Sequence, residues 1–160
     1  MILSVSLKEF DPHYIIINEK TKNNIMDQSD FHRLIYSDEN ASINGIYLNF
    51  RLENVSIEKY FNKIKCVFEN NSNNNKVISE IKSIEKMILN KFSNETNKSL
   101  ACRIQEQLEN NYIKLYGSDN IVYGKNKQIN FYLKISGIWV SNGTQEYGLT
   151  FRFFIFNNRF

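Results

Sequence analysis

The chain lacks several of the residues and patterns on which common functional sites depend. Its 160 residues include two cysteines, two histidines and one proline. No stretch approaches the roughly 20 apolar residues that a membrane-spanning helix needs. Cys66 and Cys102 are too few for a zinc site without histidine ligands, and His13 and His32 are not spaced to provide them. We find no signal peptide, and therefore expect a cytoplasmic protein, with no membrane association, whose cysteines are free thiols.

Sequence motifs of common enzymes are also missing. The chain contains no G-x-S-x-G, no H-E-x-x-H and no complete phosphate-binding loop. Gly117-Ser118 and Gly124-Lys125 resemble fragments of such a loop but lack its spacing, which indicates turns. We therefore expect no catalytic residues, no metal site and no cofactor, and predict that the protein is not an enzyme.

Aromatic and basic residues are plentiful by comparison. The chain has 12 phenylalanines and 9 tyrosines, and its formal net charge is +3 with a pI near 8.8. This mild basicity is compatible with nucleic-acid binding without requiring it. The many Asn, Lys and Ile residues are typical of an AT-rich genome.

Alternation of apolar and polar residues predicts strands over most of the chain. The predicted strands span 13–18, 31–37, 43–55, 63–69, 112–116 and two long runs between 131 and 156. Asn142-Gly143 predicts the turn of a closing hairpin, because both residues tolerate positive φ. We interpret residues 20–24 as a turn and the Asn-rich stretch 70–75 as a flexible loop.

One segment changes to helical periodicity. Apolar residues recur at helical spacing from Val77 to Phe92, with Glu80, Lys82, Glu85 and Lys86 on the other face. A second, short helix is predicted over 100–108.

This order of elements predicts a mainly β protein. One main helix inserted before the fourth strand is the arrangement of an OB-fold, a five-stranded Greek-key barrel that binds oligonucleotides on one face. We expect residues 1–160 to form a single domain of this kind. The alternative is a β-sandwich with an inserted helix, acting as a protein–protein module or a virion component.

The predicted strands share an apolar face and an outer face of aromatic and basic side chains. Rings can stack on bases and cations can neutralise phosphates, so this pattern favours single-stranded nucleic acid. Tyrosine and lysine are, however, also common on the solvent-exposed face of any sheet, which is the alternative explanation of this pattern. The candidate binding residues are Tyr47, Arg51, Lys63, Lys65, Tyr112, Lys114, Tyr132, Lys134 and Arg152.

The single tryptophan requires separate treatment. Trp139 has the same parity as Phe131, Leu133 and Ile135 in the closing hairpin. Simple alternation therefore predicts that Trp139 packs in the core rather than acting as a stacking platform.

The closing hairpin also resembles a known family. KISGIW at 134–139 and GLTFRF at 148–153 are similar to the closing motif of single-stranded DNA-binding proteins of nucleo-cytoplasmic large DNA viruses, which are related to podophage-type replication proteins. The match is specific over about twenty residues, and IQEQLENNYIKLYG at 104–117 matches more loosely. A large virus or a cytoplasmic linear plasmid would suit the composition.

The resemblance implies an OB-fold, sequence-independent binding of single-stranded DNA, and a role in replication, recombination or repair. It implies no cofactor and no catalysis, and it leaves a homo-oligomer open. The podophage-type proteins end in an acidic tail with a terminal aromatic residue that contacts polymerase and helicase. Phe160 matches that aromatic residue, whereas the acidic run is absent and Arg159 has the opposite charge.

Overall fold

The computed structural model describes residues 3–116 and 121–155. The predicted mainly β class with one main helix is confirmed. The strands are β1 (Val5–Ser6), β2 (Ile15–Lys22), β3 (Ser29–Ser37), β4 (Ser42–Asn44), β5 (Ile46–Tyr60), β6 (Lys63–Phe68), β7 (Ser99–Ala101), β8 (Tyr112–Tyr116), β9 (Gly124–Ser141) and β10 (Glu146–Ile155). The helices are α1 (Ser72–Phe92) and α2 (Arg103–Glu109), with single 3₁₀ turns at Pro12–Tyr14 and Ser93–Glu95. The main helix α1 lies between β6 and β7 in the chain, so it follows the strand at 63–69 and precedes the strand at 112–116 as predicted.

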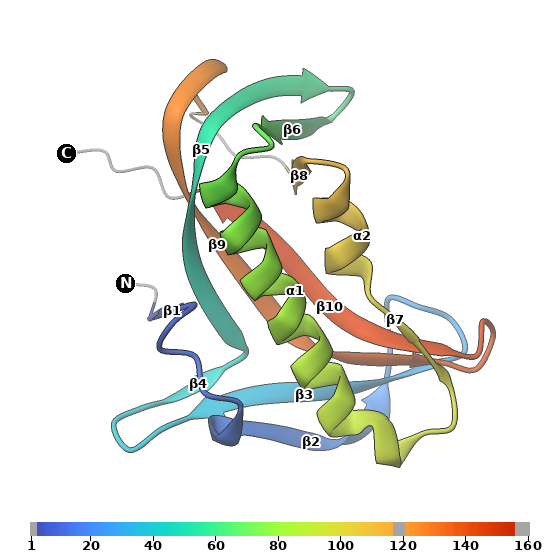
Figure 1. Ribbon diagram of the computed structural model, residues 1–160. Coiled ribbons are helices and arrows are strands. Elements are labelled where there is room, and N and C mark those ends of the chain that lie inside the picture. Colours follow the sequence, from blue (N-terminus) through green and yellow to red (C-terminus); the bar gives the residue numbers. More distant parts are fainter. Residues whose placement is uncertain (1–2, 117–120, 156–160) are drawn as a thin grey trace.

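All described strands belong to one hydrogen-bonded sheet, which curls around α1 (Figure 1). The main path runs β2-β3-β9-β5-β6-β8, and β10 pairs with the other edge of β9. These ladders are antiparallel, whereas the short β1 and β7 pair in parallel with β5 and β10. β8 lies close to β10, but no backbone ladder joins them among the described residues, so the sheet is open. The alternative architecture of two separate sheets is not found in residues 3–116 and 121–155.

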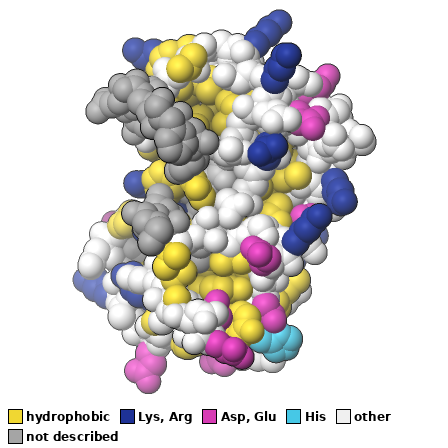
Figure 2. Space-filling model, turned by 90° about the vertical axis from the view of Figure 1, so that its left-hand side faces the viewer, with side chains coloured by type: hydrophobic (Ala, Val, Ile, Leu, Met, Phe, Trp, Pro, Cys, Tyr) yellow, Lys and Arg dark blue, Asp and Glu magenta, His cyan; other side chains and the backbone are white. Residues whose placement is uncertain are grey.

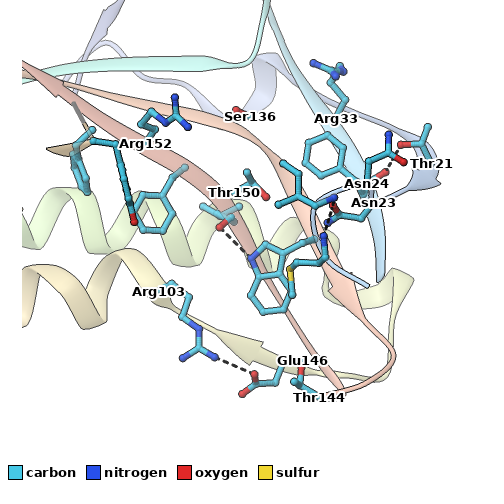
Figure 3. Close-up of a pocket in the computed structure, with 18 of the residues that line it drawn as sticks. Thr21, Asn23, Asn24, Arg33, Arg103, Ser136, Thr144, Glu146, Thr150 and Arg152 are labelled. Atoms are coloured by element: carbon cyan, nitrogen blue, oxygen red, sulfur yellow. Dashed lines mark hydrogen bonds and ion pairs between the residues drawn. The ribbon is translucent and has the colours of Figure 1, made fainter. Parts of the chain in front are cut away.

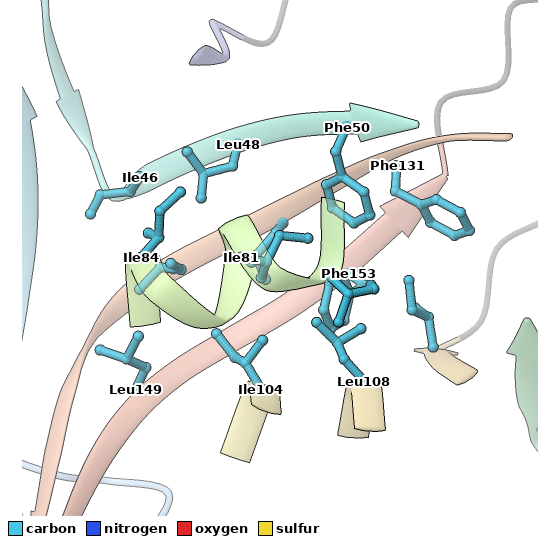
Figure 4. Close-up of a cluster of buried hydrophobic side chains, with 14 of the residues drawn as sticks. Ile46, Leu48, Phe50, Ile81, Ile84, Ile104, Leu108, Phe131, Leu149 and Phe153 are labelled. Atoms are coloured by element: carbon cyan, nitrogen blue, oxygen red, sulfur yellow. The ribbon is translucent and has the colours of Figure 1, made fainter. Parts of the chain in front are cut away.

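The inner face of the sheet carries the core. In β5 the alternation predicted from sequence is confirmed, because Ile46, Leu48 and Leu52 are at most 1% exposed. These side chains pack against the apolar face of α1, and α2 adds Ile104 and Leu108 (Figure 4). Each large apolar side chain buried in this way stabilises the fold by about 1.5–3 kcal/mol.

The Asn-rich stretch is ordered, which corrects the predicted flexible loop. The side chain of Asn71 accepts a hydrogen bond from the Asn74 N–H at 2.9 Å and caps α1, so the helix begins at Ser72 rather than near Val77. The Asn74 side chain is 1% exposed; it accepts from the Glu53 N–H and donates to the carbonyl oxygens of Glu53 and Glu69. These bonds tie α1 to β5 and to the chain leaving β6.

Glu85 is buried, although the helical pattern predicted it on the solvent face of α1. Its carboxylate accepts hydrogen bonds from the N–H groups of Ile104 at 2.9 Å and Gln105 at 2.8 Å. These donors belong to the first turn of α2, which has no side-chain cap of its own. Burial raises the pKa of the Glu85 carboxyl above its ordinary value, against the opposing effect of the two N–H groups.

Two predicted turns are placed differently in the structure. Strand β2 continues through Lys22, so residues 20–22 extend the strand instead of turning. The closing hairpin does turn after Ser141, but the residue with positive φ is Gln145, at 59°. The loop therefore spans four residues, 142–145, rather than the two residues Asn142 and Gly143.

The two cysteines are free, as predicted. Burial raises the pKa of the Cys66 thiol to about 12 and also raises that of Cys102. Among the described residues, no helix combines the length and apolar composition needed to cross a bilayer.

Candidate nucleic-acid interface

Strand β9 changes both its neighbour and its parity at Ser136. Up to Ile135 the strand pairs with β5, and from Gly137 it pairs with β3. On the other edge, Thr150 of β10 pairs with Gly137 and Phe151 pairs with Ile135, which leaves Ser136 as the extra residue of a β-bulge. Beyond the bulge Ile138 faces the core and is 0% exposed.

The bulge turns Trp139 to the outer side of the sheet. This corrects the parity argument that placed it beside Phe131, although the ring is still only 8% exposed. Its Nε1–H donates to the Leu149 carbonyl oxygen at 3.2 Å, which fixes the orientation of the indole.

Two glycines of the closing hairpin provide space for two outward rings. A Cβ on Gly148 would lie 2.7 Å from Trp139 Cζ2, and a Cβ on Gly137 would lie 2.4 Å from Phe31 Cζ. Phe31 pairs with Trp139 across β3 and β9, so both rings lie on the same outer surface. The glycines of KISGIW and GLTFRF therefore have a physical role, which is to let these rings lie against the backbone.

The two rings line a groove of about 800 Å³ on the outer side of β9 and β10 (Figure 3). It lies between the β2–β3 loop on one side and α2 and β8 on the other. Five cationic side chains line it, namely Lys22, Arg33, Arg103, Lys114 and Arg152. Five aromatic side chains line it as well, namely Phe31, Tyr116, Trp139, Phe151 and Phe153. Phe151 and Phe153 belong to the inward-facing row of β10 and pack on the core, so the outer rings are Phe31, Tyr116 and Trp139.

Glu146 is the one carboxylate among the groove-lining residues. It accepts a hydrogen bond from Arg103 Nη2 at 3.1 Å, and Glu106 holds the other guanidinium nitrogen at 2.9 Å. The hydrogen bond to Glu106 raises the pKa of the Arg103 guanidinium, and the negative charges of Glu106 and Glu146 add to this effect. Against Glu146, the five cations give the lining a formal charge of +4. Arg152 is exposed and forms no ion pair among the described residues, so its charge is available to a ligand.

The nine residues predicted for binding are all at least partly exposed, and they form two groups. The β5–β9–β10 cluster comprises Tyr47, Arg51, Tyr132, Lys134 and Arg152. Tyr47 pairs with Lys134 across β5 and β9, and Lys134 pairs with Arg152 across β9 and β10. Lys134 Nζ lies 5.5 Å from the centre of the Tyr47 ring, within the range of a cation–π contact. Arg51 donates from Nε to Asn130 Oδ1 at 3.1 Å.

The β6–β8 cluster contains the other four predicted residues, Lys63, Lys65, Tyr112 and Lys114, together with Tyr60 and Tyr116. Lys63 Nζ lies 5.2 Å from the Tyr116 ring centre, and Lys65 Nζ lies 4.9 Å from that of Tyr112. Lys114 Nζ lies 5.4 Å from the same Tyr112 ring. The lysines are thus held over aromatic faces rather than neutralised by carboxylates.

The groove joins one end of each cluster. Arg152 belongs to the β5–β9–β10 cluster and Lys114 to the β6–β8 cluster, and both line the groove. The other seven predicted residues lie outside it. In the view of Figure 2, Lys and Arg side chains are spread from the top of the molecule to its lower left, and Asp and Glu side chains are most frequent near the lower end. Phe160, predicted to contact partners, lies outside the described residues.

Sequence reasoning missed most of the groove. It did not select Lys22, Phe31, Arg33 or Arg103, because they come from strands and a helix that only the fold brings beside β10. For Trp139 a signal was present, since an isolated glycine within a strand pattern marks a bulge or a close backbone approach.

Comparison with known proteins identified no relative. No protein-family model, no curated protein and no solved structure matches the chain.

Proposed function

We propose that the protein binds single-stranded DNA without sequence preference through the groove over β9 and β10. The observation that carries this proposal is the lining itself, in which five cations and the outer rings of Phe31, Tyr116 and Trp139 surround one carboxylate that is already paired with Arg103. Sequence-independent binding of a single strand needs these two elements, cations for the phosphates and rings for the bases.

The composition of the groove favours a single strand over a duplex. Stacking on a ring such as Phe31 or Trp139 requires an unpaired base face, which a duplex does not offer along its length. Stacking contributes about 1–3 kcal/mol per base and tolerates every base. Cations such as Arg33 and Arg152 add an attraction that depends on salt because they release counterions from the phosphates.

The proposal includes an OB-fold-like barrel. Strands β5, β6, β8, β9 and β10 are five in number, and the two ends of their order, β8 and β10, lie close together. Pairing of these two ends would give a five-stranded barrel of the kind that binds oligonucleotides. The similarity of the closing hairpin to viral single-stranded DNA-binding proteins supports the same assignment. It extends the proposal to replication, recombination or repair in a cytoplasmic setting, without catalysis.

Trp139 provides a direct test, because it is the only tryptophan of the chain and lines the groove. Titration with oligo-dT is expected to change its fluorescence emission. The affinity should fall as salt rises, with a slope of about −0.7 in log K against log salt per neutralised phosphate. A duplex of the same length should bind more weakly. No binding at low salt, or equal affinity for duplex and single strand, would contradict the proposal.

A pair of lysine variants makes the test specific to the groove. Lys114→Gln is expected to weaken oligo-dT binding and to reduce the salt slope by about 0.7. Lys86→Gln removes the same charge from the exposed side of α1, away from the groove, and should change the affinity little. Equal losses in both variants would indicate attraction by net charge alone.

A further inference from the structure

The turn between β5 and β6 carries an exposed aromatic ring in an unfavourable backbone conformation. Phe61 and Asn62 form a two-residue turn, because Tyr60 and Lys63 are paired across the hairpin. Phe61 has φ of 53°, a region that bulky residues rarely adopt and that glycine fills in such turns. Its side chain is 81% exposed. The positive φ of Phe61 lowers the stability of the fold, and the exposed ring gains little from burial. A role in binding a ligand would explain why a phenylalanine occupies this position.

The Phe61 ring has aromatic and cationic neighbours. It lies edge-on to Tyr60, with ring centres 4.8 Å apart, and Tyr60 in turn lies 5.8 Å from Lys65 Nζ. Tyr60, Lys63 and Tyr116 are successive cross-strand partners over β5, β6 and β8. The next outward-facing pair of β5 and β6 joins Glu58 to Lys65.

This row of side chains reaches the groove. Tyr116 and Lys114 belong to the β6–β8 cluster and also line the groove, so rings and cations continue from Trp139 to the hairpin tip. We propose that single-stranded DNA leaving the groove runs over the outer face of β8 and β6 and that Phe61 stacks on a base at the end of this path. The inference rests on the proposed function and adds the direction and the extent of the site.

The experiment compares two lengths of oligo-dT, about six and about sixteen nucleotides, in the range that single domains of this kind cover. Phe61→Gly removes the ring and relieves the turn. We expect the variant to bind the short oligonucleotide like wild type and the long one about fivefold more weakly or worse. Its urea midpoint should rise, because glycine adopts the positive φ without strain.

Two lysines of the same hairpin provide the matched control. Lys63→Ala should lower the salt slope for the long oligonucleotide by about 0.7, because Lys63 lies in the row beside Tyr116. Lys59 is also exposed, but it precedes Tyr60 in β5 and therefore lies on the opposite face of the sheet. Lys59→Ala should leave the salt slope unchanged.

The outcomes separate the two proposals. If wild type binds both lengths and Phe61→Gly affects them equally or not at all, the path over β6 and β8 is wrong and the groove stands. A lower urea midpoint for Phe61→Gly would assign the ring to the fold and also overturn the path. If wild type binds neither length, the proposed function itself fails.

Discussion

Two pairs of aromatic rings lie on opposite faces of the same sheet, and they have different neighbours. On the inner face Phe50 and Phe131 stack with ring centres 5.6 Å apart, among aliphatic side chains beneath α1. On the outer face Phe31 and Trp139 lie over glycines and share a groove with Arg33 and other cations. Trp139 is nearly as buried as Phe131, at 8% against 0%. Burial alone therefore does not distinguish a ring that holds the fold from one that can meet a ligand; the neighbours do.

The largest effect is expected at the inner pair. Phe131→Ala should lower the free energy of unfolding by about 3–5 kcal/mol, because a fully buried ring leaves a cavity. Urea denaturation measures this loss. Phe154→Ala, the same change at an outer side chain that is 37% exposed, should cost less than about 1 kcal/mol. Similar losses in the two variants would remove the distinction between the faces.

A smaller effect is expected where the outer rings touch the backbone. Gly148→Ala places a Cβ 2.7 Å from both Trp139 Cζ2 and the Ala101 carbonyl oxygen. The indole must shift, at a cost of about 1–3 kcal/mol, and its emission should move to longer wavelength as it meets water. Fluorescence and urea denaturation of the same sample test this. Unchanged emission together with wild-type stability would show that the indole is not held against Gly148.

The buried carboxyl of Glu85, which caps α2 from the inner side of the sheet, adds a test of the same comparison through pH. Glu85 on the inner side has a raised pKa, so the native state holds its proton more tightly than the unfolded chain does. Stability should therefore fall as pH rises from about 4.5 through the native pKa. Glu85→Gln should flatten this part of the profile, whereas Ser83→Ala, an exposed change on the same helix, should preserve it. Urea midpoints across this range provide the measurement, and an unchanged profile in Glu85→Gln would contradict the assignment.

The smallest effect on stability is expected in the groove. Arg152 is exposed and unpaired among the described residues, so Arg152→Ala should change the free energy of unfolding by no more than about 0.5 kcal/mol. Oligo-dT affinity should nevertheless fall, because a phosphate loses its counter-charge. A substantial loss of stability with unchanged affinity for oligo-dT would show that Arg152 stabilises the fold and does not contact DNA.

Much of the fold could be predicted from the sequence where local alternation is uninterrupted. Ile46, Leu48 and Leu52 face inward as their period-2 pattern indicates, and α1 follows its helical spacing. The alternation of apolar and polar residues failed as a guide where a single polar side chain is buried to satisfy backbone groups. Asn74 enters the interior because three backbone groups need partners there, and Glu85 does so because α2 needs a cap.

The candidate site could be predicted less well than the fold. The outer rows that contain Lys63, Lys65 and Lys134 were identified, because alternation separates them from the core. Alternation cannot identify which rows become neighbours. Alternation also gave the wrong face for the residues of β9 after Ser136. The extra residue of the bulge reverses the direction of every later side chain until the strand ends.

The sequence by itself determined the mainly β class of the fold, the apolar faces of its strands and helix, and the abundance of rings and cations on the outer faces of the strands. These are properties of residue type and local period, and no long-range contact is needed to read them. Only the tertiary structure decided that Trp139 faces outward and that Lys22, Arg33, Arg103 and Arg152 meet in one groove. The physical reason is that a groove is made by the pairing of strands distant in sequence and by one bulge, and neither leaves a periodic trace in the chain.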